Sequence, residues 1–263
     1  MKLNSANINI LVKACRKASK VLIRDFGEIE NLQVSIKGPG DFVSASDKKV
    51  EKILIDELQK ARPNYSILSE EIGEIKNDES FKWIIDPIDG TSNFLHGIPH
   101  FAISIGLEQD KEIISGIIYD PIKDEMFAAE KGNGSYLNNQ RIRVASRSKI
   151  KDCMIFTGGP SYHEKDEVKE LALKEYKKFS SKVPVPIRKM GSASLDMAYV
   201  AAGRCDGFWQ RSLNYWDIAA GIILVKESGG FVTDFYGENK YLENKTILVT
   251  NSKINKEMID ILK

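Results

Sequence analysis

The chain has 263 residues, enough for one sizeable hydrophobic core or for two small lobes that share an interface. Its 42% hydrophobic and 29% charged residues are ordinary for a soluble globular protein. The net charge of +1 gives no global electrostatic reason to expect binding to nucleic acid or to an anionic membrane. Direct nucleic-acid binding is therefore not expected.

The three cysteines, Cys15, Cys153 and Cys205, are far apart and form no C-x-x-C pair. We interpret them as buried, reduced thiols, with a reactive thiol as the alternative. Asparagines interrupt the apolar residues near the N-terminus, and the longest apolar run, residues 218–225, is too short to span a bilayer. These patterns predict a soluble, cytoplasmic protein with no membrane association.

The N-terminal third is predicted to contain two helices and a strand between them. Apolar residues between Ile8 and Leu22 recur at helical spacing, and Gly27 closes this segment. β-Branched residues at positions 34 and 36 then suggest a strand that leads into the loop K-G-P-G-D. The loop lacks the spacing of a P-loop. It is either a surface turn or a place from which Lys37 reaches an anionic ligand.

A second amphipathic helix is expected after Ser46 and Asp47, and Pro63 ends it. The default interpretation of Asp47 is a helix cap. A strand over residues 65–68 then runs into a pair of acidic residues that begins with Glu70. These acids are either part of a solvated loop or the source of a third carboxylate for a metal.

The central stretch, residues 83–93, reads W-I-I-D-P-I-D-G-T-S-N. An apolar run over residues 81–85 predicts a buried strand. Pro87 is expected to stop the strand, and Gly90 permits the sharp turn that follows. The next three residues are types that favour the N-cap position, so we predict that a helix begins here.

Two carboxylates, Asp86 and Asp89, lie in this turn. Clustered carboxylates suit a hard divalent cation such as magnesium. A helix N-terminus beside them presents backbone N–H groups suited to phosphate. The pattern therefore indicates a metal-assisted phosphate site. The alternative is a plain turn, in which Asp and Gly serve only the backbone.

Four further segments are apolar or alternate between apolar and polar residues, and the last is a hairpin with a tight turn at Asn138-Asn139. They cover residues 101–108, 113–119, 125–130 and 136–144. Consecutive strands of this kind predict a large antiparallel sheet flanked by helices, which is an α+β layered fold. For His96 and His100, packing or hydrogen bonding is favoured over metal ligation, because the site is already rich in oxygen.

The C-terminal half begins with a lysine- and glutamate-rich segment, residues 161–182, which predicts a solvated surface helix. Residues 183–187 resemble a strand, and their two prolines favour a sheet edge. Arg188 is either a surface charge or a substrate contact. A helix of small residues then ends near Gly203.

Trp216 and Asp217 open a nearly all-apolar helix that stops at Gly229. An acid in the first turn often only complements the helix dipole. At the mouth of a buried helix, Asp217 is alternatively well placed to bind a metal. Strands over residues 231–235 and 246–250, and a helix from residue 254, complete the chain.

Four stretches resemble the inositol monophosphatase family of magnesium-dependent, lithium-sensitive phosphatases. They are Lys37 with Ser46-Asp47, Ser69-Glu70-Glu71, residues 83–94, and Trp216-Asp217-Ile-Ala-Ala with Gly229-Gly230. Their order and separation match the family over essentially the whole length. The resemblance implies an α+β fold, a five-layered αβαβα sandwich of the inositol monophosphatase and fructose-1,6-bisphosphatase type, commonly assembled as a homodimer. It also implies a single domain over residues 1–263, with a metal-site lobe of about residues 1–145 and a substrate lobe of about residues 146–263.

Carried over position by position, the resemblance implies two magnesium ions and a third, weaker one. Glu70, Asp86 and the backbone carbonyl of Ile88 would hold the first ion. Asp86, Asp89 and Asp217 would hold the second, with Asp86 bridging the two. The third would sit near Glu70 through water.

The resemblance also assigns roles around the phosphate. Gly90, Thr91 and Ser92 would bind its oxygens at the helix N-terminus. Glu70, Thr91 and Asp47 would be the catalytic residues, the last two as a hydroxyl–carboxylate pair that helps to orient the attacking water. The residues that would line the alcohol side of the substrate are Asp89, Arg188, Gly191, Ser192, Ala193, Gln210 and Asp217, with Lys37 as a further substrate contact.

The resemblance implies direct in-line hydrolysis without a phosphoenzyme, and the spacing D-x-x-D, in place of the D-x-D of phosphatases with an aspartyl nucleophile, favours the same route. Two departures concern the substrate. Gln210 stands where many inositol-specific members carry a glutamate, and Ser92 replaces a threonine. The first-choice substrate is myo-inositol 1-phosphate. Relatives that act on fructose 1,6-bisphosphate, histidinol phosphate or adenosine 3′,5′-bisphosphate, and an accessory role in the transcription machinery, are the alternatives.

Overall fold

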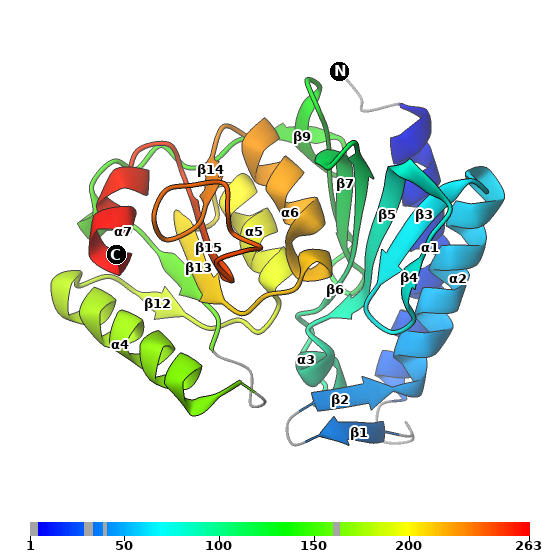
Figure 1. Ribbon diagram of the computed structural model, residues 1–263, viewed down its shortest axis with the longest axis horizontal. Helices are drawn as coiled ribbons and strands as arrows, with labels where there is room; N and C mark the ends of the chain where they lie inside the picture. The colour runs from blue at the N-terminus through cyan, green and yellow to red at the C-terminus, as the bar shows by residue number, and fades with distance from the viewer. Residues whose placement is uncertain (1–4, 29–33, 39–40, 160–163) are drawn as a thin grey trace.

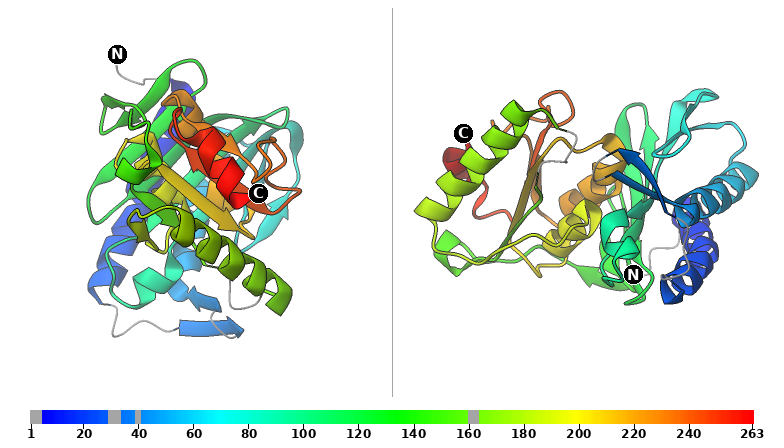
Figure 2. Two further views of the ribbon diagram at one scale, coloured as in Figure 1. Left: turned by 90° about the vertical axis from the view of Figure 1, so that its left-hand side faces the viewer. Right: turned by 90° about the horizontal axis from the view of Figure 1, so that it is seen from below.

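The computed structural model describes residues 5–28, 34–38, 41–159 and 164–263 of the chain, which form five layers of helices and sheets (Figure 1). Within these ranges, the side chains of residues 34–44, 78 and 79 are not described. The predicted role of the Lys37 side chain therefore lies outside the described part. Two outer helix layers lie at opposite ends of the molecule (Figure 2). This arrangement confirms the predicted αβαβα sandwich.

The first layer is a pair of packed helices, α1 (Ala6–Gly27) and α2 (Ala45–Ala61). Their apolar stripes are buried against the outer face of the first sheet, which forms one hydrophobic cluster with them. A short antiparallel hairpin of β1 (Val34–Gly38) and β2 (Asp41–Ser44) connects the two helices. Because α2 begins at Ala45, Asp47 lies within its first turn, and the prediction that Ser46 and Asp47 precede the helix was wrong.

The second layer is an eight-stranded sheet with the order β10-β9-β8-β7-β6-β5-β3-β4 among the described residues. Its neighbouring strands are antiparallel except for β3 and β5, which are parallel. The predicted sheet is therefore confirmed, but it is mixed. Its strands are β3 (Tyr65–Ser69), β4 (Gly73–Ile75), β5 (Asp78–Asp89), β6 (Ala102–Gln109), β7 (Glu112–Asp120), β8 (Glu125–Glu130), β9 (Gly134–Leu137) and β10 (Gln140–Ile142).

The third layer consists of α5 (Ala193–Ala201) and α6 (Tyr215–Glu227), which lie between the two sheets. Both helices are apolar almost all round, as expected of helices buried on two sides. Gly106 and Gly116 let α6 approach the first sheet closely, since a Cβ atom at Gly116 would lie 2.7 Å from Ile223 and 2.9 Å from the Cα of Ala220.

The fourth and fifth layers are a five-stranded sheet and the helices α4 (Asp166–Lys182) and α7 (Asn255–Leu262) that cover it. The strand order is β12-β11-β13-β15-β14 in the described part. These strands are β11 (Ile155–Thr157), β12 (Ile187–Arg188), β13 (Gly207–Arg211), β14 (Phe231–Thr233) and β15 (Thr246–Thr250). The strand predicted over residues 183–187 is only the two-residue β12, although it does lie at the sheet edge.

Two smaller elements complete the described part, α3 (Thr91–Leu95) and a 3₁₀ turn, η2 (Ile150–Asp152). The three cysteines are buried and free, as predicted. No helix in the described ranges is both long enough and apolar enough to cross a membrane.

The close approach at Gly116 gives a stability prediction. We expect Gly116→Ala to lower the free energy of unfolding by about 1–3 kcal/mol, because the added methyl group meets backbone that cannot move aside. Chemical denaturation measures this change. Gly27→Ala is the control, because a Cβ atom there meets nothing within 4 Å. Equal stability of both variants would contradict the close packing of α6 on the sheet.

Candidate functional site

Two acidic positions meet at one edge of the first sheet because β3 and β5 are parallel. Ser69 pairs with Ile85, so both strands finish at the same edge. Glu70 follows β3 there, and its N–H donates to the carbonyl of Ile85 at 3.3 Å. The strand pairing therefore brings Glu70 beside Asp86, the next residue of β5. Helix α3 begins at this edge, and the N-terminal ends of α2 and α6 also point towards it (Figure 1).

Strand β5 does not stop at Pro87, which corrects the prediction. Asp86 pairs with Ser104 and Asp89 with Ala102, so β5 carries one more residue than β6 across this interval. Such a bulge accommodates a residue without an N–H group. Within it, the N–H of Ile88 donates to Asp86 Oδ1 at 3.0 Å.

Gly90 makes the turn from β5 into α3. Its φ is +95°, in the left-handed region, and a Cβ atom would lie 3.1 Å from the carbonyl oxygen of His100 and 3.2 Å from that of Gly191. Glycine is therefore required here both by conformation and by space. The predicted helix start is confirmed at Thr91, with Gly90 as the N-cap.

Asp89 is held by the start of α5, more than 100 residues further along the chain. Its Oδ2 accepts hydrogen bonds from the hydroxyls of Ser192 and Ser194 and, at 2.7 Å, from the N–H of Ser194. These donors fix the carboxylate against the start of α5. The sequence analysis did not identify Ser194. It placed Ser192 beside the substrate, and in the structure the Ser192 hydroxyl donates to Asp89.

The remaining carboxylates come from helix first turns. Asp217 is the third residue of α6, and its Oδ2 accepts the N–H of Asn214 at 2.6 Å, which completes a capping box. Asp47, in the first turn of α2, is buried. Both predicted alternatives for Asp217 are thus compatible: it caps the helix with one oxygen and lies among acidic neighbours.

The carboxylates at this edge act on one another electrostatically. Burial raises the pKa of Asp86 well above its usual range, and repulsion by Glu70, Asp89, Asp217 and Asp47 raises it further. Burial and the charge of Asp89 raise the pKa of Asp217 to about 7. Burial also raises the pKa of Asp89, against the hydrogen bonds that it accepts. A cation bound among these groups would offset the cost of burying their charges and would reduce their mutual repulsion.

The donor set fits magnesium in kind, since every predicted side-chain ligand is a carboxylate and the remaining ligand is a carbonyl oxygen. Within the described ranges, no three carboxylate, imidazole or thiol groups are yet close enough to enclose an ion. The ligand types at this edge are therefore those that magnesium prefers.

Helix α3 carries the residues that are predicted to bind phosphate. The Thr91 hydroxyl donates to the carbonyl of Ile88 at 2.8 Å. Asn93, predicted only as a capping type, donates through Nδ2 to the carbonyls of His100 at 2.8 Å and Met190 at 2.9 Å. Asn93 therefore ties the loop after α3 to the loop before α5. One of these partners is 97 residues away, so the sequence offered only the position of Asn93 in the motif as a signal of this role.

The alcohol-side residues belong to the second sheet and its loops. Arg188 is exposed on β12, and Gln210 lies on β13 beside β11. The side chain of Gln210 lies directly over Gly158, where a Cβ atom would come within 1.8 Å of Oε1. Gly191, with φ +89°, faces the Asn93 amide and connects β12 to α5. The contacts of these residues with a substrate stay predictions.

The two histidines have the packing and hydrogen-bonding roles that were favoured. His96 Nδ1 lies 2.7 Å from the carbonyl oxygen of Ser92. His100 is 5% exposed and packs edge-on against Tyr199. Burial, with the charge of Lys123, lowers the pKa of His100 to about 4, so its imidazole is neutral at physiological pH.

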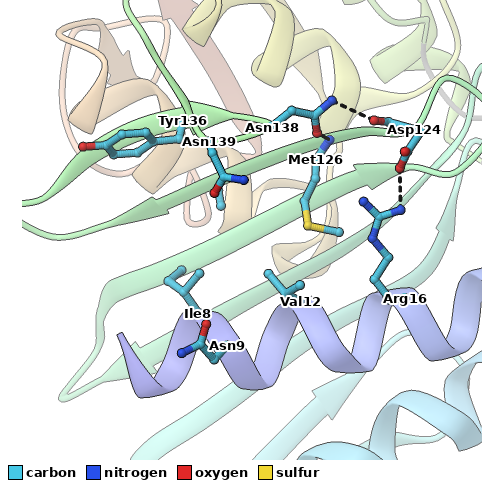
Figure 3. Close-up of a pocket in the computed structure, with 10 residues that line it drawn as sticks. Ile8, Asn9, Val12, Arg16, Asp124, Met126, Tyr136, Asn138 and Asn139 are labelled. Carbon is cyan, nitrogen blue, oxygen red and sulfur yellow. Dashed lines mark hydrogen bonds and ion pairs between the residues drawn. The ribbon is translucent and has the colours of Figure 1, made fainter. Parts of the chain in front are cut away.

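A cavity of about 440 Å³ lies apart from the carboxylates, between α1 and the β8–β9 hairpin (Figure 3). Apolar side chains such as Val12 and Met126 line it, and an Arg16–Asp124 ion pair closes one end. None of the residues predicted for catalysis, metal or substrate lines this cavity. Its size alone does not make it the functional site.

Comparisons with known proteins agree with the motif order and the fold. The family model described as "Inositol monophosphatase family" matches residues 4–262. A Rhizobium meliloti protein named inositol-1-monophosphatase is 50% identical over 259 residues, which are 98% of this chain and 96% of that protein. A Pseudomonas aeruginosa protein named Nus factor SuhB is 36% identical over 255 residues, or 96% of this chain and 94% of that protein.

A solved structure has the same fold as this chain. The crystal structure of the extragenic suppressor protein suhB from Bartonella henselae matches with a TM-score of 0.93 and 48% identity, covering 98% of this chain and 99% of that one. The chain belongs to the inositol monophosphatase family.

Proposed function

We propose that this phosphoric monoester hydrolase is magnesium-dependent and acts on myo-inositol 1-phosphate. The enzyme class rests on the family and on relatives, 43–50% identical, that are named inositol-1-monophosphatase. The observation that carries the mechanism is the gathering of Glu70, Asp86, Asp89 and Asp217 at one sheet edge beside the start of α3. Such a site combines ligands for a hard cation with backbone donors for phosphate.

In this proposal the magnesium ligands are the four carboxylates and the carbonyl of Ile88. Bound magnesium supplies positive charge against the phosphate dianion and lowers the pKa of water for attack. Ser192 and Ser194 hold Asp89 through Oδ2. Two or three ions per site, and lithium sensitivity, remain part of the proposal.

The protein itself orients the phosphate and the attacking water. Gly90 brings the first turn of α3 to the edge, where the N–H groups of residues 91 and 92 have no partner within the helix. These groups, including that of Ser92, would bind phosphate oxygens. Thr91 and Asp47 would orient the water, with Glu70 opposite, and the reaction would proceed by direct in-line attack.

The alcohol half of the substrate is proposed to lie against residues of the second sheet. Gln210 and Arg188 would contact the substrate hydroxyls, together with the segment from Gly191 to Ala193, and Lys37 is a further proposed substrate contact. An amide at position 210 both donates and accepts hydrogen bonds, whereas a carboxylate only accepts. The alternative substrates are those implied by the family resemblance: fructose 1,6-bisphosphate, histidinol phosphate and adenosine 3′,5′-bisphosphate. A homodimer in the cytoplasm is the proposed assembly and location.

A second candidate function is an accessory factor of the transcription machinery. It is favoured by relatives named Nus factor SuhB, which match over 94–96% of this chain at 35–38% identity. The chain carries the full set of acidic positions at the site, which favours a working enzyme. An RNA gel shift that weakens with salt, together with absent phosphatase activity, would reverse this order.

Replacing Asp89 tests the metal assignment. We expect Asp89→Asn to lower phosphate release by more than about 100-fold, since the loss of a direct ligand exceeds the usual effect of losing an outer-sphere partner. The fold should persist, because an amide oxygen still accepts hydrogen bonds from Ser192 and Ser194. Asp124→Asn, which removes an exposed carboxylate paired with Arg16, is the control and should keep its activity. Near wild-type activity of Asp89→Asn would show that the assignment is wrong.

Stability against pH tests the charge cluster without turnover. Because the folded-state pKa of Asp217 is about 7 and its ordinary value is 3.8, folding favours the protonated acid. This contribution to stability is therefore present at low pH and is lost as pH rises from about 4 to about 7. Asp217→Asn should then gain melting temperature relative to the metal-free wild type as pH rises.

Magnesium should raise the wild-type melting temperature far more at about pH 8 than at about pH 5, since only ionised carboxylates bind the ion. Differential scanning fluorimetry with EDTA or magnesium measures both effects. A pH-independent difference between the wild type and Asp217→Asn would argue against a buried, repelled carboxylate at this position.

A substrate panel with Gln210→Glu tests the alcohol side. We expect the variant to lower KM for inositol 1-phosphate by about tenfold, because hydrogen bonds to a charged acceptor are stronger than those to an amide. The panel contains inositol 1-phosphate, fructose 1,6-bisphosphate, histidinol phosphate and adenosine 3′,5′-bisphosphate. An unchanged order of preference would remove Gln210 from the substrate pocket.

A further inference from the structure

Helix α2 carries a buried carboxylate that the proposed chemistry does not use. Glu51 lies one turn after Asp47 and continues the stripe that Leu54 and Leu58 bury against the first sheet. Its side chain is 2% exposed, and no described lysine, arginine or histidine forms an ion pair with it. A buried acid without a cation is costly unless hydrogen bonds replace its water. The hydrogen-bond donors around Glu51 therefore indicate its structural role.

The side chain of Glu51 accepts hydrogen bonds from the turn that carries Glu70. Glu51 Oε1 accepts hydrogen bonds from the Ser69 hydroxyl, from the N–H of Glu71 at 3.1 Å and from the N–H of Ile72 at 3.2 Å. The three donors lie on both sides of Glu70 in the chain. Glu51 thus binds the side chain that precedes Glu70 and the backbone that follows it.

The same turn is also fixed from its other sides. It closes the β3–β4 hairpin, in which Ser69 pairs with Gly73, and Gly73 has φ +78°. The N–H of Glu70 donates to Ile85 of β5. The hairpin and β5 set where the turn lies, and Glu51 sets how its backbone is oriented relative to α2.

We propose that Glu51 is a positioning residue for Glu70. It holds the turn so that Glu70 remains beside Asp86 before any metal binds. This orientation has to be imposed, because Glu70 and Asp86 repel each other at the buried edge. Part of the free-energy cost of bringing Glu70 and Asp86 together is then met when the protein folds. The Glu51 contact therefore raises the affinity of the site for magnesium. The inference rests on the proposed role of Glu70 as a metal ligand.

A carboxylate suits this task better than an amide. It only accepts hydrogen bonds, and its charge strengthens each of them. Glutamine at the same position keeps the shape and one acceptor oxygen but loses the charge. Glu51→Gln therefore loosens the turn without opening a cavity in the core.

The first measurement is amide hydrogen exchange in the metal-free protein. We expect Glu51→Gln to speed exchange of the Glu71 and Ile72 amides by about tenfold, the effect of losing roughly 1.4 kcal/mol of local protection. Amides in the middle of β3 should not change. The matched control is Glu57→Gln, which alters another poorly exposed acid of α2, one that pairs with Lys13 and Lys17 of α1.

The second measurement is magnesium binding by calorimetry without substrate. The affinity of Glu51→Gln should fall by about 10- to 100-fold, as for other partners that orient a metal ligand, while Glu57→Gln keeps the wild-type affinity. Ser69→Ala, which removes one of the three donors, should show a smaller loss of affinity. It also serves as the deciding variant if Glu51→Gln does not fold.

Two results would overturn the inference. Wild-type magnesium affinity in Glu51→Gln, or in Ser69→Ala if that variant decides, would show that the contact serves only the fold, even if exchange becomes faster. Unchanged exchange of the Glu71 and Ile72 amides would show that Glu51 does not hold the turn. If the wild-type protein itself binds no magnesium, the proposed metal site fails, and the positioning role fails with it. The wild-type titration therefore separates the failure of the proposed function from that of the inference alone.

Discussion

The parallel pairing of β3 with β5 is the constraint on which the site depends. Every other neighbouring pair in the eight-stranded sheet is antiparallel within the described part. If β3 also ran antiparallel to β5, Glu70 would lie at the opposite edge from Asp86, a full strand length away. The parallel pair places both acids at one edge, and the bulge at Pro87 turns Asp89 towards the same place.

Each acid at this edge is held by donors that leave part of it open. Asp89 accepts from two serines, Asp217 from the backbone at the start of its own helix, and Asp86 from the N–H of Ile88. Glu70 is held indirectly, through the backbone that Glu51 contacts. Burial raises the pKa of Asp86, and repulsion by the neighbouring acids raises it further. The fold thus fixes the acids in a state that a divalent cation would relieve.

Local sequence patterns predicted what local interactions determine. The helical stripe of α1, the β8 strand and the Asn138-Asn139 turn are confirmed, the last with φ of 46° and 67°. Strands β11 and β13 were missed because they are short, buried on both faces and have no alternation. The support of the site was missed for a different reason. Ser194 and Glu51 act on acids or turns in other elements, and the spacing of one sequence does not reveal such partners.

The division of labour between the two sheets explains why reaction class is easier to infer than substrate. The residues proposed for metal and phosphate lie at one edge of the first sheet and at helix starts, where one misplaced backbone group would disturb several others. Gln210 and Arg188 lie on the second sheet. The side chain of Gln210 occupies the space above Gly158, where a Cβ atom would collide with it. Side chains there can change without moving β3 or β5. If Gln210 and Arg188 contact the substrate as proposed, substrate preference can vary among proteins that share the same acidic edge.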